Sequence, residues 1–332
     1  MQHIGVHPKT AGSCSSMAEN RVVVAGRATS VDGMTTPAVR PVAPASRDQW
    51  GALVAVAITV LAWASAFVAI RAVGAHYEPG PLTLGRLLIG SLALGAGLLV
   101  TRRWVWPTRR EWALIVLCGI SWFGIYNIAL NAAEQRIDAG TTAMLVNVGP
   151  ILIALFAGLL LGEGFPRWLV IGALIAFSGA VLVGAATSNA AESDLLGVVL
   201  SLVAAVTYAV GVLAQKPVLR RLPGLQVTWL ACTMAAIACV PFTPGLLSEL
   251  AAAPGAATAG LVYLGVVPTA LAFSTWAYAL ARMDAGRLGV STYLVPPVTI
   301  LMSAALLGEV PALLALVGGA VCLVGVGLSR RR

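Results

Sequence analysis

The side chains best suited to hold a small solute lie on one apolar stretch in the first half of the chain. Trp122, Tyr126 and Asn127 fall within a turn and a half of a helix. Asn131 follows Asn127 one turn later. Aromatic rings beside amide and hydroxyl groups offer an apolar surface and a few hydrogen bonds, which suits a small amphipathic compound. A helix must present these side chains on one face for them to contact the same solute.

Further candidates lie near prolines and in the second half. A helix proline removes one backbone hydrogen bond and can free a carbonyl oxygen to face a cavity. Asn147 precedes Pro150 by three residues, and Tyr293 stands just before Pro296. The candidate substrate-binding residues are Trp63, Arg86, Trp122, Tyr126, Asn127, Asn147, Trp276 and Tyr293. Neutral hydroxyl groups accompany them at Thr269, Ser274, Thr275, Ser291 and Thr292.

No residue pattern supports catalysis or metal binding. His3, His7 and His76 lie outside the apolar runs, so no serine–histidine pair can form within them. The HExxH zinc motif and a phosphate-binding P-loop are both absent from the sequence. The five cysteines contain no CxxC pair, and four lie within apolar runs, where cysteine behaves as a small hydrophobic residue. The sequence predicts no enzyme activity, no metal and no cofactor.

The composition places these residues in a membrane protein. Hydrophobic residues make up 59% of the 332 residues, charged residues only 10%, and the mean hydropathy is +0.90. A soluble domain carries roughly 25% charged residues because its surface must stay wet. The apolar residues here come in runs of about 20, long enough to cross a hydrocarbon core of about 30 Å. We therefore expect an all-α, polytopic membrane protein in contact with the lipid bilayer.

Ten apolar segments are separated by short connections rich in proline, glycine and charge. They span approximately residues 51–71, 81–100, 112–132, 139–161, 167–185, 195–214, 226–242, 257–280, 286–307 and 311–328. With ten crossings and a cytoplasmic N-terminus, all but three of the 21 Lys and Arg residues fall on the cytoplasmic side. This distribution predicts a multi-pass protein of the cell membrane with both termini cytoplasmic. The net charge of +8 thus reflects topology and does not indicate a nucleic-acid partner.

An internal repeat divides the hydrophobic part of the chain. Asp138-Ala139-Gly140 recurs 146 residues later as Asp284-Ala285-Gly286. The same separation relates Leu160-Leu161-Gly162-Glu163 to Leu306-Leu307-Gly308-Glu309, Pro150 to Pro296, Gly119 to Gly265, Gly172 to Gly318 and Gly179 to Gly325. A charged triplet and a four-residue motif at one separation indicate a duplication.

Each half contains five predicted helices, so the second half must enter the membrane from the opposite side. Inverted halves can rock about a central binding site and give it alternating access to the two sides. We expect a disordered cytoplasmic tail at 1–49, a first repeat at 50–185, a loop at 186–194, a second repeat at 195–328 and a basic C-terminus at 329–332. The alternative is a receptor or scaffold that binds a small molecule without moving it.

These motifs resemble the EamA family of the drug/metabolite transporter superfamily over about residues 50–328. Trp63-Ala64-Ser65-Ala66-Phe67 is similar to the family's Trp-Gly-Ser-x-Phe pattern, with Ala64 in place of the commoner glycine. Pro81 to Arg86 resembles the opening of the second helix, and Tyr263-Leu264-Gly265-Val266 that of the eighth. The two Leu-Gly-Glu endings resemble those of the fourth and ninth helices. The resemblance implies a ten-helix carrier that moves amino acids or similar small polar metabolites, usually outward.

Charged residues near the membrane leave two interpretations open. Arg86 lies about five residues into its segment, where it either reaches the outer interface or binds a substrate carboxylate. Glu163 and Glu309 fall at equivalent helix ends, where capping a tight interhelical turn or pairing with nearby Arg167 on the inner side would be a structural role. Arg71 and Lys216 fit interface anchors. Since no acidic residue lies at the middle of a segment, we expect transport to need no membrane-embedded carboxylate.

The neutral residues also have structural alternatives. Ser, Thr and Asn side chains hydrogen-bond between membrane helices, and Trp and Tyr gather at membrane interfaces. Gly158 and Gly162 have the GxxxG spacing that permits close helix approach, which leaves a homodimer open. With 35 glycines in the chain, such spacing also arises by chance.

Overall fold

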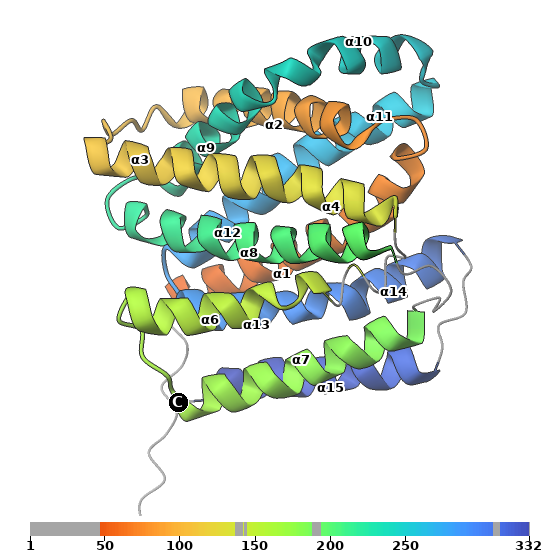
Figure 1. Ribbon diagram of the computed structural model, residues 1–332. Helices are drawn as coiled ribbons and strands as arrows, with labels where there is room; N and C mark the ends of the chain where they lie inside the picture. The colour runs from red at the N-terminus through yellow and green to blue at the C-terminus, as the bar shows by residue number, and fades with distance from the viewer. Residues whose placement is uncertain (1–46, 137–141, 143–144, 188–193, 308–312, 332) are drawn as a thin grey trace, which may run out of the picture. The chain divides into compact units, whose positions relative to one another are not determined.

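The computed structural model describes residues 47–136, 142, 145–187, 194–307 and 313–331, and the regular elements in these ranges are all helices (Figure 1). Most of the predicted tail, Asp138 and Glu309 lie outside the described residues. The first half contains α1 (Arg47–Val73), α2 (Pro79–Thr101), α3 (Arg109–Cys118), η1 (Gly119–Ile125), α4 (Tyr126–Glu134), α6 (Gly149–Leu160) and α7 (Arg167–Thr187). The second half contains α8 (Leu195–Val218), α9 (Gly224–Ala238), η2 (Val240–Phe242), α10 (Thr243–Ala252), α11 (Gly255–Leu264), η3 (Gly265–Leu271), α12 (Ala272–Leu280), α13 (Ala285–Ser291), η4 (Thr292–Leu294), α14 (Val295–Leu307) and α15 (Leu313–Ser329).

These helices have the length and surface of membrane helices. Within the described residues, five helical stretches are long and apolar enough to cross a membrane. Helix α9 followed by η2 and α10 forms a sixth candidate, and shorter apolar helices cover 149–160, 167–182 and 316–329. Large aliphatic side chains such as Leu92 and Leu99 are 75% and 78% exposed. An apolar outer surface of this extent is stable against lipid and not against water.

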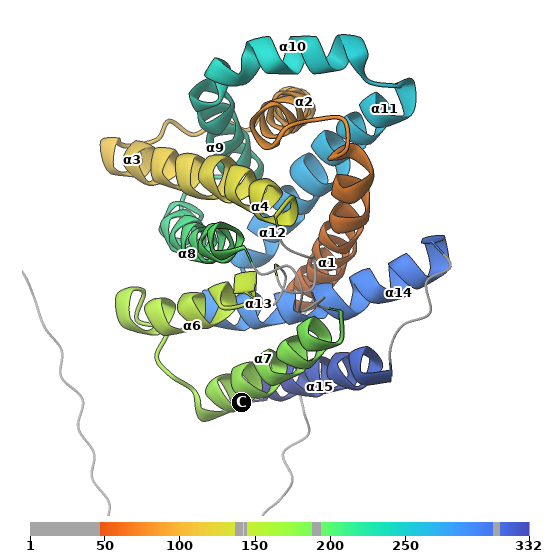
Figure 2. The same cartoon turned by 45° about the vertical axis from the view of Figure 1, so that its right-hand side comes forward.

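The seventh predicted segment continues further than its sequence pattern indicated. Helix α9 ends at Ala238, η2 follows, and α10 runs on to Ala252 after a bend of 55°. Pro241 and Pro244 lack the N–H that would extend the preceding helix, but proline is tolerated in the first turn of a new one. The two prolines therefore end one helix and begin the next. Figure 2 shows α10 turned away from the direction of α9.

The two halves repeat the same helix breaks in the same register. Two π-helices, η1 and η3, each follow a helix of 10 residues and precede one of 9 residues. Each begins at a glycine of the predicted repeat. A Cβ on Gly119 would lie 2.5 Å from the carbonyl oxygen of Ala231 in α9, and one on Gly265 would lie 2.6 Å from the side chain of Ile89 in α2. The glycines thus let each broken helix pack closely against a helix of the other half.

Helices α7 and α15 lie side by side (Figure 1 and Figure 2). A Cβ on Gly172 would lie 2.6 Å from the carbonyl oxygen of Gly325, and one on Gly179 would lie 2.6 Å from that of Gly318. As the residue number increases along α7, the number of the contacting residue in α15 decreases, so the two helices are antiparallel. The repeat makes Gly172 equivalent to Gly318 and Gly179 to Gly325. The operation that exchanges the halves therefore also exchanges these two contacts.

Hydrogen bonds join the connections at two opposite ends of the helices. At one end, Arg221 forms an ion pair with Glu111, which belongs to the first turn of α3. At the other end, Arg136 lies 3.0 Å from Asp194, the N-cap of α8. The Leu196 N–H and the Arg136 guanidinium both lower the pKa of Asp194, because each stabilises the charged carboxylate. The connections with most of the predicted cytoplasmic charge gather at the first end, at the left of Figure 1.

Candidate functional site

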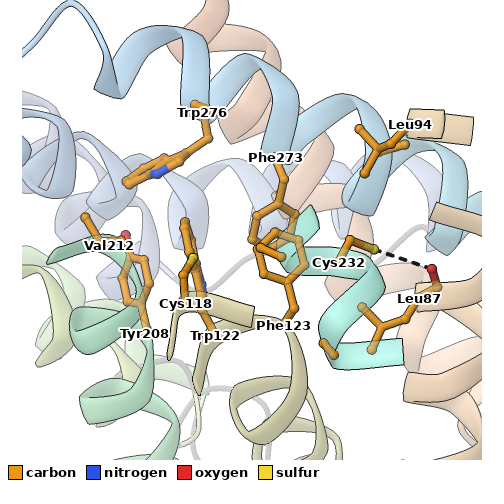
Figure 3. Packing of buried hydrophobic residues seen from close by; sticks show 14 of the residues in the cluster. Leu87, Leu94, Cys118, Trp122, Phe123, Tyr208, Val212, Cys232, Phe273 and Trp276 are labelled. Carbon is orange, nitrogen blue, oxygen red and sulfur yellow. Dashed lines mark hydrogen bonds between the residues drawn. The ribbon is translucent and has the colours of Figure 1, made fainter. Parts of the chain in front are cut away.

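Aromatic side chains from four helical stretches meet in the interior, and Figure 3 shows five of them: Trp122, Phe123, Tyr208, Phe273 and Trp276. This aromatic cluster consists of Trp63, Trp122, Phe123, Tyr126, Tyr208, Phe273 and Trp276. The Trp63 ring centroid lies 5.1 Å from that of Trp276 and 6.0 Å from that of Trp122. Trp122 is 1% exposed, and its ring lies 4.8 Å from Phe273. Edge-to-face and tilted contacts of this kind stabilise the rings beyond the area they bury. Four predicted residues, Trp63, Trp122, Tyr126 and Trp276, are thus brought together.

A glycine and a helix break position these rings. Gly211 of α8 packs directly on the Cβ of Trp122, so no side chain fits on α8 at this place. Trp122 and Phe123 belong to η1, and π-helical turns of this kind are common at functional sites. The Asn127 Nδ2 donates to the carbonyl oxygens of Trp122 and Phe123 at 3.3 Å and 2.8 Å. Asn127 therefore stabilises the break that presents the rings, and its contact with substrate stays a prediction.

Arg86 extends from α2 into the protein. The residue is 4% exposed, and its Nε donates to Thr269 Oγ1 at 3.1 Å. Thr269, in η3, in turn donates to the carbonyl oxygen of Leu264 at 2.8 Å. Glu134 interacts electrostatically with the guanidinium. The structure does not support an Arg86 that reaches the outer interface, because its side chain is buried against the other half. A cation in this position is costly without a function.

Several buried polar groups around these residues are not satisfied. Asn131 donates from Nδ2 to Thr83 Oγ1 at 3.2 Å, one turn from Arg86 on α2, but its Oδ1 has no hydrogen-bond partner within the described residues. The same holds for Trp276 Nε1 and for both amide atoms of Gln215, a residue that is 0% exposed. Buried polar atoms are nearly always hydrogen-bonded in native proteins. These groups therefore mark where a solute or water would complete the hydrogen bonding.

Asn147 and Tyr293 meet across the two halves. Tyr293, in η4, donates its hydroxyl to the backbone carbonyl oxygen of Asn147 at 2.9 Å. Both residues lie where helical structure is interrupted just before the predicted prolines, Pro150 and Pro296. The Tyr293 hydroxyl thus satisfies a backbone carbonyl at the interruption before Pro150. Both residues are buried, and their contact with substrate stays a prediction.

Glu163 and Lys216 cap helix ends. The Glu163 carboxylate accepts from the backbone N–H groups of Ala285 at 2.8 Å and Gly286 at 3.1 Å, at the start of α13. Lys216 Nζ donates to the carbonyl oxygens of Leu280, at 2.7 Å, and Met283, at the end of α12. A negative charge at a helix N-terminus and a positive one at a C-terminus are both stabilising. Glu163 thus caps α13 of the second half and not the short turn that follows α6, and the role of Lys216 as an interface anchor stays a prediction.

Three residues of this region were missed from the sequence: Tyr208, Phe273 and Gln215. Tyr208 had one signal, since it is the repeat equivalent of Trp63 at a separation of 145 residues. Phe273 and Gln215 had none, because an apolar ring or a single amide in an apolar segment does not reveal the direction it faces. Within the described residues, no three His, Cys, Asp or Glu side chains gather in a way that would hold a metal ion.

Known proteins with similar sequences are transporters by name. The chain is 40% identical to a protein of Streptantibioticus cattleyicolor named "Probable terminal-alkyne amino-acid exporter", over 84% of this chain and 93% of that one. It is 33% identical to the transporter YdfC of Bacillus subtilis, over 80% and 86% of the two chains. A "Probable amino-acid metabolite efflux pump" of Salmonella typhimurium is 26% identical, over 82% and 92%.

The fold and the family agree with these similarities. A crystal structure with 22% sequence identity shares the fold, with a TM-score of 0.69 over 85% of this chain and 96% of that one. The model of the EamA-like transporter family matches residues 49–185 and again residues 195–331. With a family match in each half and an apolar helical surface, the chain is a membrane transporter that belongs to the EamA-like transporter family.

Proposed function

We propose that this transporter exports an amino acid with a compact apolar side chain, and that it does so by alternating access to the aromatic cluster and Arg86. One observation carries the proposal: the guanidinium of Arg86 is buried and donates to Thr269 in η3, which continues directly into α12 with the cluster residues Phe273 and Trp276. The names of the relatives from Streptantibioticus cattleyicolor and Salmonella typhimurium support an amino acid as the substrate class and export as the direction.

Arg86 and the aromatic cluster fit the two parts of such a substrate. A guanidinium binds a carboxylate through two parallel hydrogen bonds, which favours Arg86 as the partner of the α-carboxylate. The rings of Trp63, Trp122 and Trp276 offer an apolar wall for the side chain, and an indole face also attracts an ammonium group. The unsatisfied Trp276 Nε1 and Asn131 Oδ1 provide a further donor and acceptor. A rod-shaped apolar group such as a terminal alkyne suits a wall of this kind.

The internal contacts support ten helices arranged as two inverted halves. Tyr293 contacts Asn147, and Cys322 donates to the carbonyl oxygen of Ala176 at 3.3 Å; each pair is separated by 146 residues. A residue touches its own repeat equivalent only beside the axis that relates the repeats. Since α7 and α15 are antiparallel there, the axis runs perpendicular to them and hence in the membrane plane. Halves related in this way can rock about a central site.

The topology can be tested by labelling single cysteines in intact cells. We expect a cell membrane protein with both termini cytoplasmic. Arg220→Cys should react with an impermeant maleimide only after permeabilisation, whereas Ala256→Cys, at the opposite end of the helices, should react from outside. Both residues are exposed, so reactivity reports the side of the membrane. The opposite labelling pattern would rule out this orientation.

The transport activity can be tested with L-propargylglycine, an amino acid whose side chain ends in an alkyne. Proteoliposomes preloaded with the unlabelled compound should accumulate the radiolabelled one by counterflow, and empty liposomes should not. A receptor or scaffold binds the compound without exchanging it, so binding without counterflow would favour that alternative. Cells that overproduce the protein should also release more of the compound than cells that lack it.

A further inference from the structure

A cavity of about 280 Å³ lies at the end of the helices where Glu163 and Lys216 form their caps. Its walls include Leu161 and Leu280, and its charged groups are Glu163, Lys216, Arg220 and Asp284. It shares no lining residue with the aromatic cluster or with Arg86. Small-molecule pockets have volumes of roughly 300–1,000 Å³, so this cavity is at the lower end of that range and has room for an amino acid.

Charges of both signs line this cavity. Lys216 and Arg220 lie one turn apart at the end of α8, whereas Glu163 follows α6 and Asp284 precedes α13. A solute with a carboxylate alone would be repelled by the two acids, and one with an amine alone by the two bases. A zwitterion matches both pairs. We infer that this cavity is a loading site for zwitterionic amino acids, an inference that rests on the proposed export function.

The caps made by Glu163 and Lys216 couple binding of an amino acid in the cavity to release of the turn between α12 and α13. Lys216 and Glu163 hold the turn between α12 and α13 through bonds to backbone groups. A bound amino acid offers its carboxylate to Lys216 and its ammonium to Glu163, and so competes with both caps. Loss of the caps frees this turn, and Leu280 in the cavity wall lies one turn beyond Trp276 on α12. The loading site and the aromatic cluster are thus joined through α12, and the buried Gln215 is next to Lys216 in the chain.

The inference can be tested with a cysteine at Ala281, an exposed residue of the cavity wall. The background is Cys14→Ser, since the other four cysteines are buried. L-Propargylglycine should slow maleimide labelling of the purified full-length protein. Pent-4-ynoic acid, which lacks the ammonium, and but-3-yn-1-amine, which lacks the carboxylate, should protect at least about tenfold less well.

Variants of the charged residues test whether binding in the cavity causes the protection from maleimide. Glu163→Gln and Arg220→Gln should each raise about tenfold the concentration of L-propargylglycine that protects the cysteine. Arg282 stacks on Tyr278 and does not line the cavity, so Arg282→Gln should leave this concentration unchanged. Counterflow without protection would overturn the loading site and leave the proposed function standing. Protection without counterflow would support the binding site and overturn export. Equal protection by all three compounds would overturn the zwitterion specificity.

Discussion

Arg86→Gln is expected to lower L-propargylglycine counterflow by about a hundredfold or more while the protein still folds. Removing one partner of a buried charge pair costs about 3–5 kcal/mol, because the remaining charge is left unpaired in a medium of low polarity. Here that remaining charge would be the substrate carboxylate. Glutamine keeps much of the side chain's length and can still donate to Thr269. The loss should therefore fall mainly on recognition of the carboxylate.

The matched control is Arg136→Gln, because Arg136 lies at the predicted outer end in an exposed pair with Asp194. Exposed pairs contribute at most about 1 kcal/mol, so this variant should transport at close to the wild-type rate. Arg86→Lys should fall between the two, since it keeps the charge and loses the two-pronged geometry.

Inhibition of counterflow by but-3-yn-1-amine distinguishes a loss of carboxylate recognition from damage to the fold. This amine has no carboxylate, so its inhibition of residual counterflow should be the same in Arg86→Lys as in the wild type. A structural role for Arg86 predicts that every ligand weakens together. Wild-type counterflow by Arg86→Gln would show that the carboxylate binds elsewhere.

The sequence predicted helix positions well because helix and repeat signals are carried by the residues themselves. The separation that pairs Gly119 with Gly265 also separates η1 from η3. The π-helical form of these segments could not be predicted, since it depends on how closely α9 and α2 approach the two glycines. Helix α10 shows the same limit: the prolines marked an interruption but not the direction in which the chain continues.

The candidate site was predictable in part. Trp63, Trp122, Tyr126 and Trp276 could be chosen as aromatic residues in apolar segments, and the fold brings them together. The sequence did not reveal that Asn127 bonds its own helix. The burial of Arg86 was equally hidden, because its side-chain direction is set by Thr269, 183 residues away. The cavity depends on the ends of four helices, α6, α8, α12 and α13, which only the tertiary structure brings together.

Gly325→Ala is expected to lower the melting temperature of the purified protein by about 5 °C. The added methyl group would overlap the backbone of Ala176 in α7, with 2.7 Å to its Cα. Overpacking at a rigid contact costs about 1–3 kcal/mol, and each kcal/mol lowers the melting temperature of a chain of this size by about 2–4 °C. The antiparallel contact of α7 and α15 would have to widen.

Gly327→Ala is the matched control, because it lies two residues further along the same helix and a Cβ there meets nothing within 4 Å. Alanine stabilises a helix relative to glycine by up to about 1 kcal/mol, so this variant should melt at the wild-type temperature or slightly above it. Gly179→Ala should behave like Gly325→Ala, since the repeat makes the two positions equivalent and a Cβ on Gly179 would lie 2.6 Å from the Cys322 nitrogen. If Gly325→Ala and Gly327→Ala melted alike, α7 and α15 would not be in close contact, and an axis through this helix pair would lose its support.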